Sequence, residues 1–227
     1  IEEIRRHEDQ PPFGAEEQCR AAHYGSHPLG RSVYGTVQSI TDLTVEAMRD
    51  YFQRRYSPGN IALVAAGRID FDALVATAER CSGSWQPFDA GRVRLPVNVN
   101  QGFLVVQQET ATQQYAVGMA DGPSATDDDR HAAGLLTTVL GDDTGSRLYW
   151  EMVDPGLAEH ASLGHLEHEE AGLYLTQMSC APDRAADNLK RIVEIYRQAE
   201  RDGITEEELS QAKSKWSSHI VLSSERP

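Results

Sequence analysis

The stretch Leu43–Gly83, LTVEAMRDYFQRRYSPGNIALVAAGRIDFDALVATAERCSG, decides the fold class of this chain. Its first third predicts a helix that begins after Thr44, a residue type that caps helices well. The apolar run over residues 60–67 predicts a buried strand, and residues 70–83 predict a second amphipathic helix. Helix, strand and helix in quick succession indicate an α/β layer. The expected core-facing stripe of the first helix consists of Val45, Met48, Phe52 and Tyr56.

A second run of such elements follows residues 87–98, which contain two prolines, show no helical period and predict a linker. Strands are expected at 102–109 and 113–122, and as a hairpin around the turn at 170–172. A helix is expected after the cap residue Thr126, and a long one at 183–203 that ends at Gly203. The two halves have similar elements but no strict sequence repeat.

The predicted fold class is therefore α+β, with two similar α/β-layer domains whose mixed or antiparallel sheets are covered by helices. Residues 1–88 are expected to form the C-terminal part of a first domain, and residues 96–227 a second domain truncated at its C-terminus. The chain begins without Met inside an amphipathic helix. A helix capped by Thr205 and Glu208 runs toward Pro227 without a clear tertiary ending. We expect a piece of a longer protein.

Composition excludes some classes of function. Of 227 residues, 21 are basic and 35 acidic, a net charge of −14 that disfavours nucleic acid and anionic lipid as partners. No apolar run approaches the roughly 20 residues of a membrane span. The three cysteines, Cys19, Cys81 and Cys180, are too few and too scattered for a disulfide framework or a metal site. They are interpreted as buried or half-buried thiols.

The histidine-rich segment HASLGHLEHEE at residues 160–170 invites a metal-site interpretation. The spacing of His165 and His168 is one residue short of the H-x-x-E-H zinc motif, which works only on a helix. The flanks predict a strand, so a solvated hairpin is the favoured interpretation. No phosphate-binding loop and no G-x-S-x-G elbow is present. Glu3 and His7, four residues apart on one helix, could pair or merely lie side by side.

Four segments in order carry a family resemblance: IEEIRRHEDQP, YGSHPLGRSVYGT, ITDLTVEAMRDYFQRRYSPGNIALVAAG and GDDTGSRLYWEMVDPGLAEHASL. Together they resemble the pitrilysin/insulysin-type zinc metallopeptidases, in the branch that includes mitochondrial processing peptidase. In that family an H-x-x-E-H helix is followed, some seventy residues later, by a distal glutamate that binds zinc and precedes an acidic, proline-containing segment. Glu3, followed by Ile4 and EDQPP, matches that position.

The resemblance implies that Glu3 is the third zinc ligand, beside two imidazoles and a water. The general base would be the glutamate of an H-x-x-E-H motif upstream of Ile1. Residues 1–88 would then end a zinc-bearing peptidase domain, and residues 96–227 would be the second domain of that half. This chain alone is expected to bind no zinc tightly and to cleave nothing.

The family's substrate-binding half also carries an Arg and, seven residues on, a Tyr. No Arg lies between Glu151 and Ala158 here, and Glu159 stands at the Tyr position. The resemblance therefore implies a second homologous half or subunit that supplies this pair, with peptides hydrolysed in a closed chamber between the halves. The alternative is a non-catalytic scaffold homologue, like the family's core subunits of respiratory complexes. An unrelated α/β binding domain is the third hypothesis, and the compartment, cytoplasmic or periplasmic in bacteria, stays open.

Overall fold

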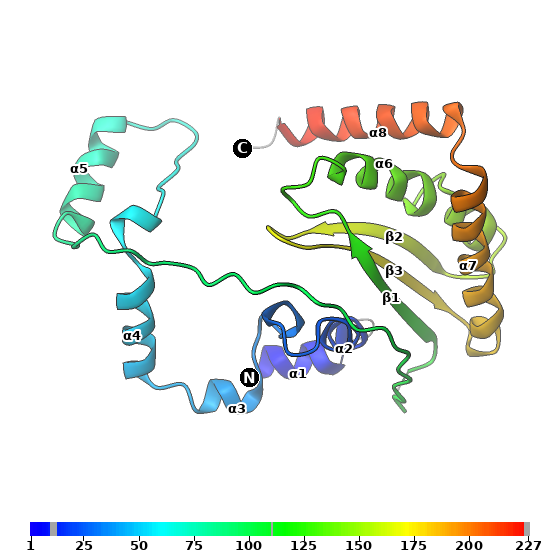
Figure 1. Cartoon of the computed structure of the whole chain (residues 1–227), viewed down its shortest axis with the longest axis horizontal. Helices are drawn as coiled ribbons and strands as arrows, with labels where there is room; N and C mark the ends of the chain where they lie inside the picture. The colour runs from blue at the N-terminus through cyan, green and yellow to red at the C-terminus, as the bar shows by residue number, and fades with distance from the viewer. Residues whose placement is uncertain (10–12, 110, 225–227) are drawn as a thin grey trace. The chain divides into compact units, whose positions relative to one another are not determined.

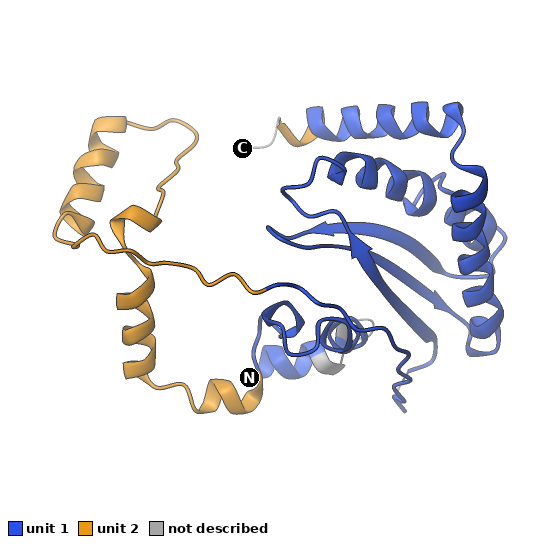
Figure 2. Cartoon of the chain, in the orientation of Figure 1, with its two compact units in different colours: residues 1–35, 96–221 blue, residues 36–95, 222–227 orange. Residues whose placement is uncertain are grey.

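A computed structural model describes residues 1–9, 13–109 and 111–224. The chain forms two compact units, residues 1–35 with 96–221 and residues 36–95 with 222–227 (Figure 2). The first 35 residues thus belong with the second half of the chain, whereas sequence patterns group them with residues 36–88. The division at residues 88–96 concerns domains of a longer protein and stays a prediction.

The centre of the first unit is a three-stranded antiparallel sheet in the order β1-β3-β2 (Figure 1). Strand β1 spans Gln114–Gly122, β2 His160–Glu167 and β3 Gly172–Cys180. Gln177 of β3 lies opposite Val117 of β1 and Ser162 of β2, which fixes the register. The strand at 113–122 and the hairpin around 170–172 are confirmed, and so is the α+β class with its antiparallel sheet covered by helices.

One face of this sheet carries the hydrophobic core. Helices α6 (Arg130–Gly141), α7 (Ala185–Asp202) and α8 (Glu206–Ser224) surround it (Figure 1). Thr176 of β3 points to this face, where its hydroxyl lies 2.9 Å from the Tyr196 hydroxyl of α7. The largest fully buried apolar side chains are Leu148, Met152, Leu173, Met178 and Ile195.

The other face receives helix α2 (Phe13–Tyr24), and helix α1 (Glu2–Asp9) packs against α2. Gln177, next to Thr176 on β3, points to this side because successive strand residues face opposite ways. Its amide donates a 3.3 Å hydrogen bond to Glu16 of α2. Cys19, half-buried on the same helix, contacts the Val117 carbonyl of β1 at 3.7 Å. Helix α2 therefore packs directly on the sheet (Figure 1).

The shorter helical pieces connect these elements. The 3₁₀ turns span Pro28–Gly30 and Pro182–Arg184, and a π-helical segment spans Tyr149–Val153. Helix α7 ends at Gly203, whose positive φ of 75° glycine adopts without strain. Helix α6 begins at Arg130, four residues after the expected cap, and the Thr126 hydroxyl donates to the Glu169 carbonyl. That start was placed wrongly.

The second unit contains helices α3 (Val37–Thr41), α4 (Val45–Arg55) and α5 (Phe71–Ser82), with a 3₁₀ turn at Pro58–Asn60. Thr44 accepts a hydrogen bond from Ala47, which confirms the predicted N-cap, and Asp70 accepts one from Ala73 at the start of α5. The predicted strand at 60–67 was wrong, since residues 61–66 form no strand. A strand needs a hydrogen-bonding neighbour, and the described residues of this unit contain none.

The apolar stripe of α4 is exposed rather than core-facing, which corrects a second expectation. Val45, Met48, Phe52 and Tyr56 are all classed as exposed, although Phe52 still stacks on Tyr56 and meets Trp85 edge-on. The expected strand at 102–109 also fails to form, and Phe103 is largely exposed. Cys180 is buried as expected and Cys81 is exposed. No described helix is long and apolar enough to cross a membrane.

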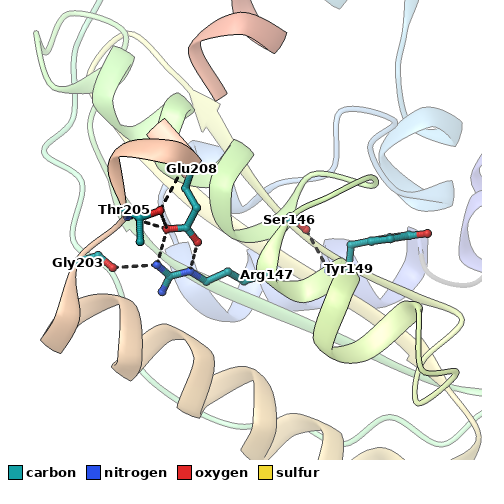
Figure 3. A network of polar contacts seen from close by, with 6 residues as sticks. All are labelled: Ser146, Arg147, Tyr149, Gly203, Thr205 and Glu208. Carbon is teal, nitrogen blue, oxygen red and sulfur yellow. Dashed lines mark hydrogen bonds and ion pairs between the residues drawn. The ribbon is translucent and has the colours of Figure 1, made fainter. Parts of the chain in front are cut away.

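An ion pair ties the segment after α6 to the start of α8 (Figure 3). The Arg147 guanidinium donates two hydrogen bonds to Glu208, at 2.7 and 2.9 Å, and a third to the Gly203 carbonyl at 2.9 Å. Glu208 also accepts from the backbone of Thr205 at 2.7 Å, which confirms the predicted capping box. The hydrogen bond from Arg147 is the main reason that the pKa of Glu208 falls to about 2.

Acid should therefore weaken this unit through Glu208. A carboxylate whose folded-state pKa is depressed stabilises the fold above its unfolded pKa and loses that contribution as the pH falls through the folded pKa. We expect Glu208→Gln to lower the free energy of unfolding by about 1 to 2 kcal/mol at pH 7, a discounted value because the pair is partly solvated. The difference from wild type should shrink between pH 4.5 and about 2 in urea titrations. Glu206→Gln is the matched control, and equal effects of both variants would contradict the assignment.

Candidate functional site

Glu3 lies on the exposed side of α1, while its neighbour Ile4 is buried, with 5% of its surface exposed. The Arg5 amide closes the first helical turn onto the Ile1 carbonyl at 3.1 Å. Within the described parts of the chain, no hydrogen bond or ion pair engages the Glu3 carboxylate. A free carboxylate on a helix held by a buried neighbour is suited to bind a cation or a donor from outside.

His7, one turn after Glu3, interacts with α2 and not with Glu3. Its Nε2 atom lies 3.5 Å from Oε1 of Glu17, and both side chains are about three-quarters buried. The Tyr34 ring lies on the same imidazole, with ring centroids 4.7 Å apart. The sequence left open whether Glu3 pairs with His7, and the structure assigns His7 a different carboxylate.

The Glu17 carboxylate also holds the loop that follows the 3₁₀ turn. Ser32 donates a 2.6 Å hydrogen bond to the same Oε1 atom. The Ser32 hydroxyl in turn accepts from the Tyr34 amide at 3.2 Å, and Gly35 continues the turn with a φ of 73°. Helix α1, helix α2 and the 32–35 loop therefore meet at one carboxylate.

The neighbouring residue Glu16 points the other way, toward the sheet. It accepts 2.6 Å and 3.3 Å hydrogen bonds from Arg20 and Gln177 respectively.

Burial, the largest effect, raises the pKa of the Cys19 thiol, which therefore stays protonated and is a poor metal ligand.

The end of α2 is held by the segment that leads to the second half of the chain. The Asn100 amide donates to the His23 carbonyl at 2.7 Å, and its side chain to the Ala22 carbonyl at 3.2 Å. The buried His23 ring lies 3.5 Å from Asp121 at the end of β1. The orientation of α2 is thus set at both of its ends.

The histidines of the 160–170 hairpin are not gathered into a cluster of three or more metal-ligating side chains among the described residues. His165 lies on β2 with its side chain only 3% exposed, 2.8 Å from the Pro123 carbonyl. Burial, followed by the charge of Arg20, lowers the pKa of His168. The hairpin is confirmed, but these two histidines are not solvated as expected. Among the described residues, no three or more His, Cys, Asp and Glu side chains gather as metal ligands.

A hollow in the first unit is a second candidate site. It has a volume of about 230 Å³ and lies between α6 and α8. Arg147 and Lys215 are already paired there, with Glu208 and Asp142 respectively, and Glu151 also lines the hollow. Most of the charge in this hollow is therefore neutralised within the fold, and Glu3 stays the candidate site residue.

The structure adds Glu17 and Ser32 to the residues that sequence patterns singled out. An isolated Glu and an isolated Ser carry no sequence signal, because their roles come from a contact between residues 15 positions apart. The position expected to hold a substrate-binding Tyr is Glu159, just before β2, and its amide donates to the Ser179 carbonyl at 2.9 Å.

Residues 42–215 match the sequence family described as the peptidase M16 inactive domain. A protein of Mycobacterium leprae named as an uncharacterized zinc protease is 30% identical over 229 residues, covering 98% of this chain and 51% of that protein. The chain spans about half the length of the curated relatives it matches.

Two solved structures share the fold. A peptidase M16 inactive domain from Pseudomonas fluorescens matches with a TM-score of 0.83 and 20% identity, over 96% of this chain and 53% of that chain. A chain of complex III2 from Candida albicans matches with a TM-score of 0.81 and 15% identity, over 97% and 54% of the two chains. At these identities the likeness shows the fold alone.

The role of Ile4 in holding α1 can be tested directly. Ile4→Ala removes a buried side chain and should cost about 2 kcal/mol or more of local stability. We expect hydrogen exchange of the α1 amides to accelerate at least tenfold, while the amides of β3 keep their protection. The exposed Arg6→Ala is the control on the same helix, and equal exchange in both variants would show that α1 does not depend on Ile4.

Proposed function

We propose that this chain, which belongs to the peptidase M16 inactive-domain family, is part of a zinc-dependent endopeptidase. Its contribution to that enzyme is the metal ligand Glu3. The observation that carries the proposal is the free, exposed Glu3 carboxylate on a helix whose other side is buried. A carboxylate oxygen is a normal zinc ligand and fits beside two imidazoles. Relatives named as zinc proteases support zinc as the metal.

The remaining parts of the site would come from outside the 227 residues. Two imidazoles and the general base would lie in an H-x-x-E-H helix of the longer protein. Zinc bound there would supply a Lewis acid that activates water for peptide hydrolysis. The work of this chain is to hold the Glu3 oxygen in place.

The peptide partner follows from the same proposal. Glu159 stands at the position where the family's substrate-binding half carries its Tyr, and no Arg lies between Glu151 and Ala158. A second homologous half or subunit would therefore supply that pair and close the chamber. The net charge of −14 favours basic peptides as substrates. Residues 1–88 and 96–227 would then be parts of the first and second domains of the zinc-bearing half.

A second candidate function is a non-catalytic scaffold of the same fold. The similarity to a chain of complex III2 from Candida albicans favours it, since this fold also occurs outside proteins named as proteases. The two functions differ in one requirement, because only the enzyme needs Glu3 to bind metal.

The deciding variant is Glu3→Gln in the full-length protein. It keeps the size of the side chain and removes the anionic oxygen that zinc prefers. We expect zinc affinity to fall at least a hundredfold and cleavage of a fluorogenic basic peptide to fall below about 1% of wild type.

Glu2→Gln, on the same helix turn, is the matched control and should keep both zinc and activity. Full metal content in Glu3→Gln, measured by mass spectrometry after dialysis against a weak chelator, would reject Glu3 as a ligand. A wild-type protein that holds no zinc at all would favour the scaffold.

A further inference from the structure

We infer that Glu17 is a positioning residue for Glu3: its carboxylate, fixed by Ser32, holds the His7 side of α1 and so sets the direction in which the Glu3 oxygen points. The inference rests on the proposed function, since it concerns how the same metal ligand is oriented. Ligands of metal sites depend on such outer contacts, and their loss typically lowers metal affinity 10- to 100-fold.

The first step is the geometry of α1. Residues four apart lie on one stripe of a helix, so Glu3 and His7 share a face. Ile4 is buried on a neighbouring face and resists displacement of the helix from α2. One buried side chain does not fix rotation about the helix axis, whereas a second contact on another face does. The contact of His7 with Glu17 is that second constraint.

The second step is that the Glu17 carboxylate is itself held. The 2.6 Å hydrogen bond from Ser32 is short, as expected for a hydroxyl bound to a carboxylate. It ends on the same oxygen that lies 3.5 Å from His7. Tyr34, with its ring 4.7 Å from the imidazole, adds a further contact. The imidazole is therefore confined by Glu17 and Tyr34.

The third step connects this arrangement to the sheet. Glu16 and Glu17 are adjacent on α2, and their side chains engage different partners: Glu16 binds Gln177 of β3, and Glu17 binds the α1 side. Cys19 and His23 add contacts between α2 and β1. Helix α2 thereby fixes the position of Glu3 relative to the sheet. That sheet belongs to the domain that the family description calls inactive.

The test uses full-length protein and two conservative changes. Glu17→Gln keeps the shape of the side chain and removes its charge, while Ser32→Ala removes only the hydroxyl. We expect both to weaken zinc binding about tenfold in competition with a chromogenic chelator. Ser32→Thr, which keeps a hydroxyl, should bind zinc with wild-type affinity. The exposed Glu200→Gln of α7 controls for the loss of one negative charge.

If Ser32 only stabilised the fold, its loss would lower the melting temperature and the exchange protection of α1 together with zinc affinity. The melting temperature and the exchange protection of α1 should change little in Ser32→Ala, although its zinc affinity falls. His7→Gln combined with Glu17→Gln should lower zinc affinity by less than the product of the two single losses, because the two changes share the His7–Glu17 contact.

The outcomes separate the two claims. If Glu3→Gln loses zinc while Glu17→Gln and Ser32→Ala bind it like wild type, the positioning role is overturned and the proposed function survives. If Glu3→Gln retains zinc, the proposed function fails and the inference falls with it. Equal losses in Ser32→Ala and Ser32→Thr would also overturn the role of the hydroxyl.

Discussion

The contact of α2 with its two neighbours is the constraint on which the candidate site depends. Helix α2 binds the sheet through Glu16 and Cys19, and binds α1 and the 32–35 loop through Glu17. None of these groups is unusual alone. Because these groups lie on one short helix, they attach both α1 and α2 to the sheet of the first unit. The exposed Glu3 carboxylate thereby acquires a defined position.

The sequence predicted elements well where local signals and long-range partners agree. The cap at Thr44, the Thr205–Glu208 box and the Gly203 helix end are local hydrogen-bond patterns, and all of them form. The predicted strands at 60–67 and 102–109 do not form. Both are apolar runs whose strand character depends on a neighbouring strand, and periodicity contains no information about one.

The candidate site was predictable in part. The type and position of Glu3 came from a resemblance, since a Glu in an amphipathic helix is otherwise unremarkable. The roles of Glu17 and Ser32 could not come from the sequence, because they depend on a close contact between a helix and a loop 15 residues later. The histidine-rich hairpin is the opposite case. Its histidines are prominent in the sequence, but His165 is used for packing against the Pro123 carbonyl.

The most direct test is the anomalous scattering of zinc in crystals of the full-length protein, measured on both sides of the zinc absorption edge. We expect a single strong peak about 2.0 to 2.2 Å from a Glu3 carboxylate oxygen, with two imidazole nitrogens completing the protein ligands. A zinc peak coordinated without Glu3, or a Glu3 side chain turned away from the bound metal, would contradict it.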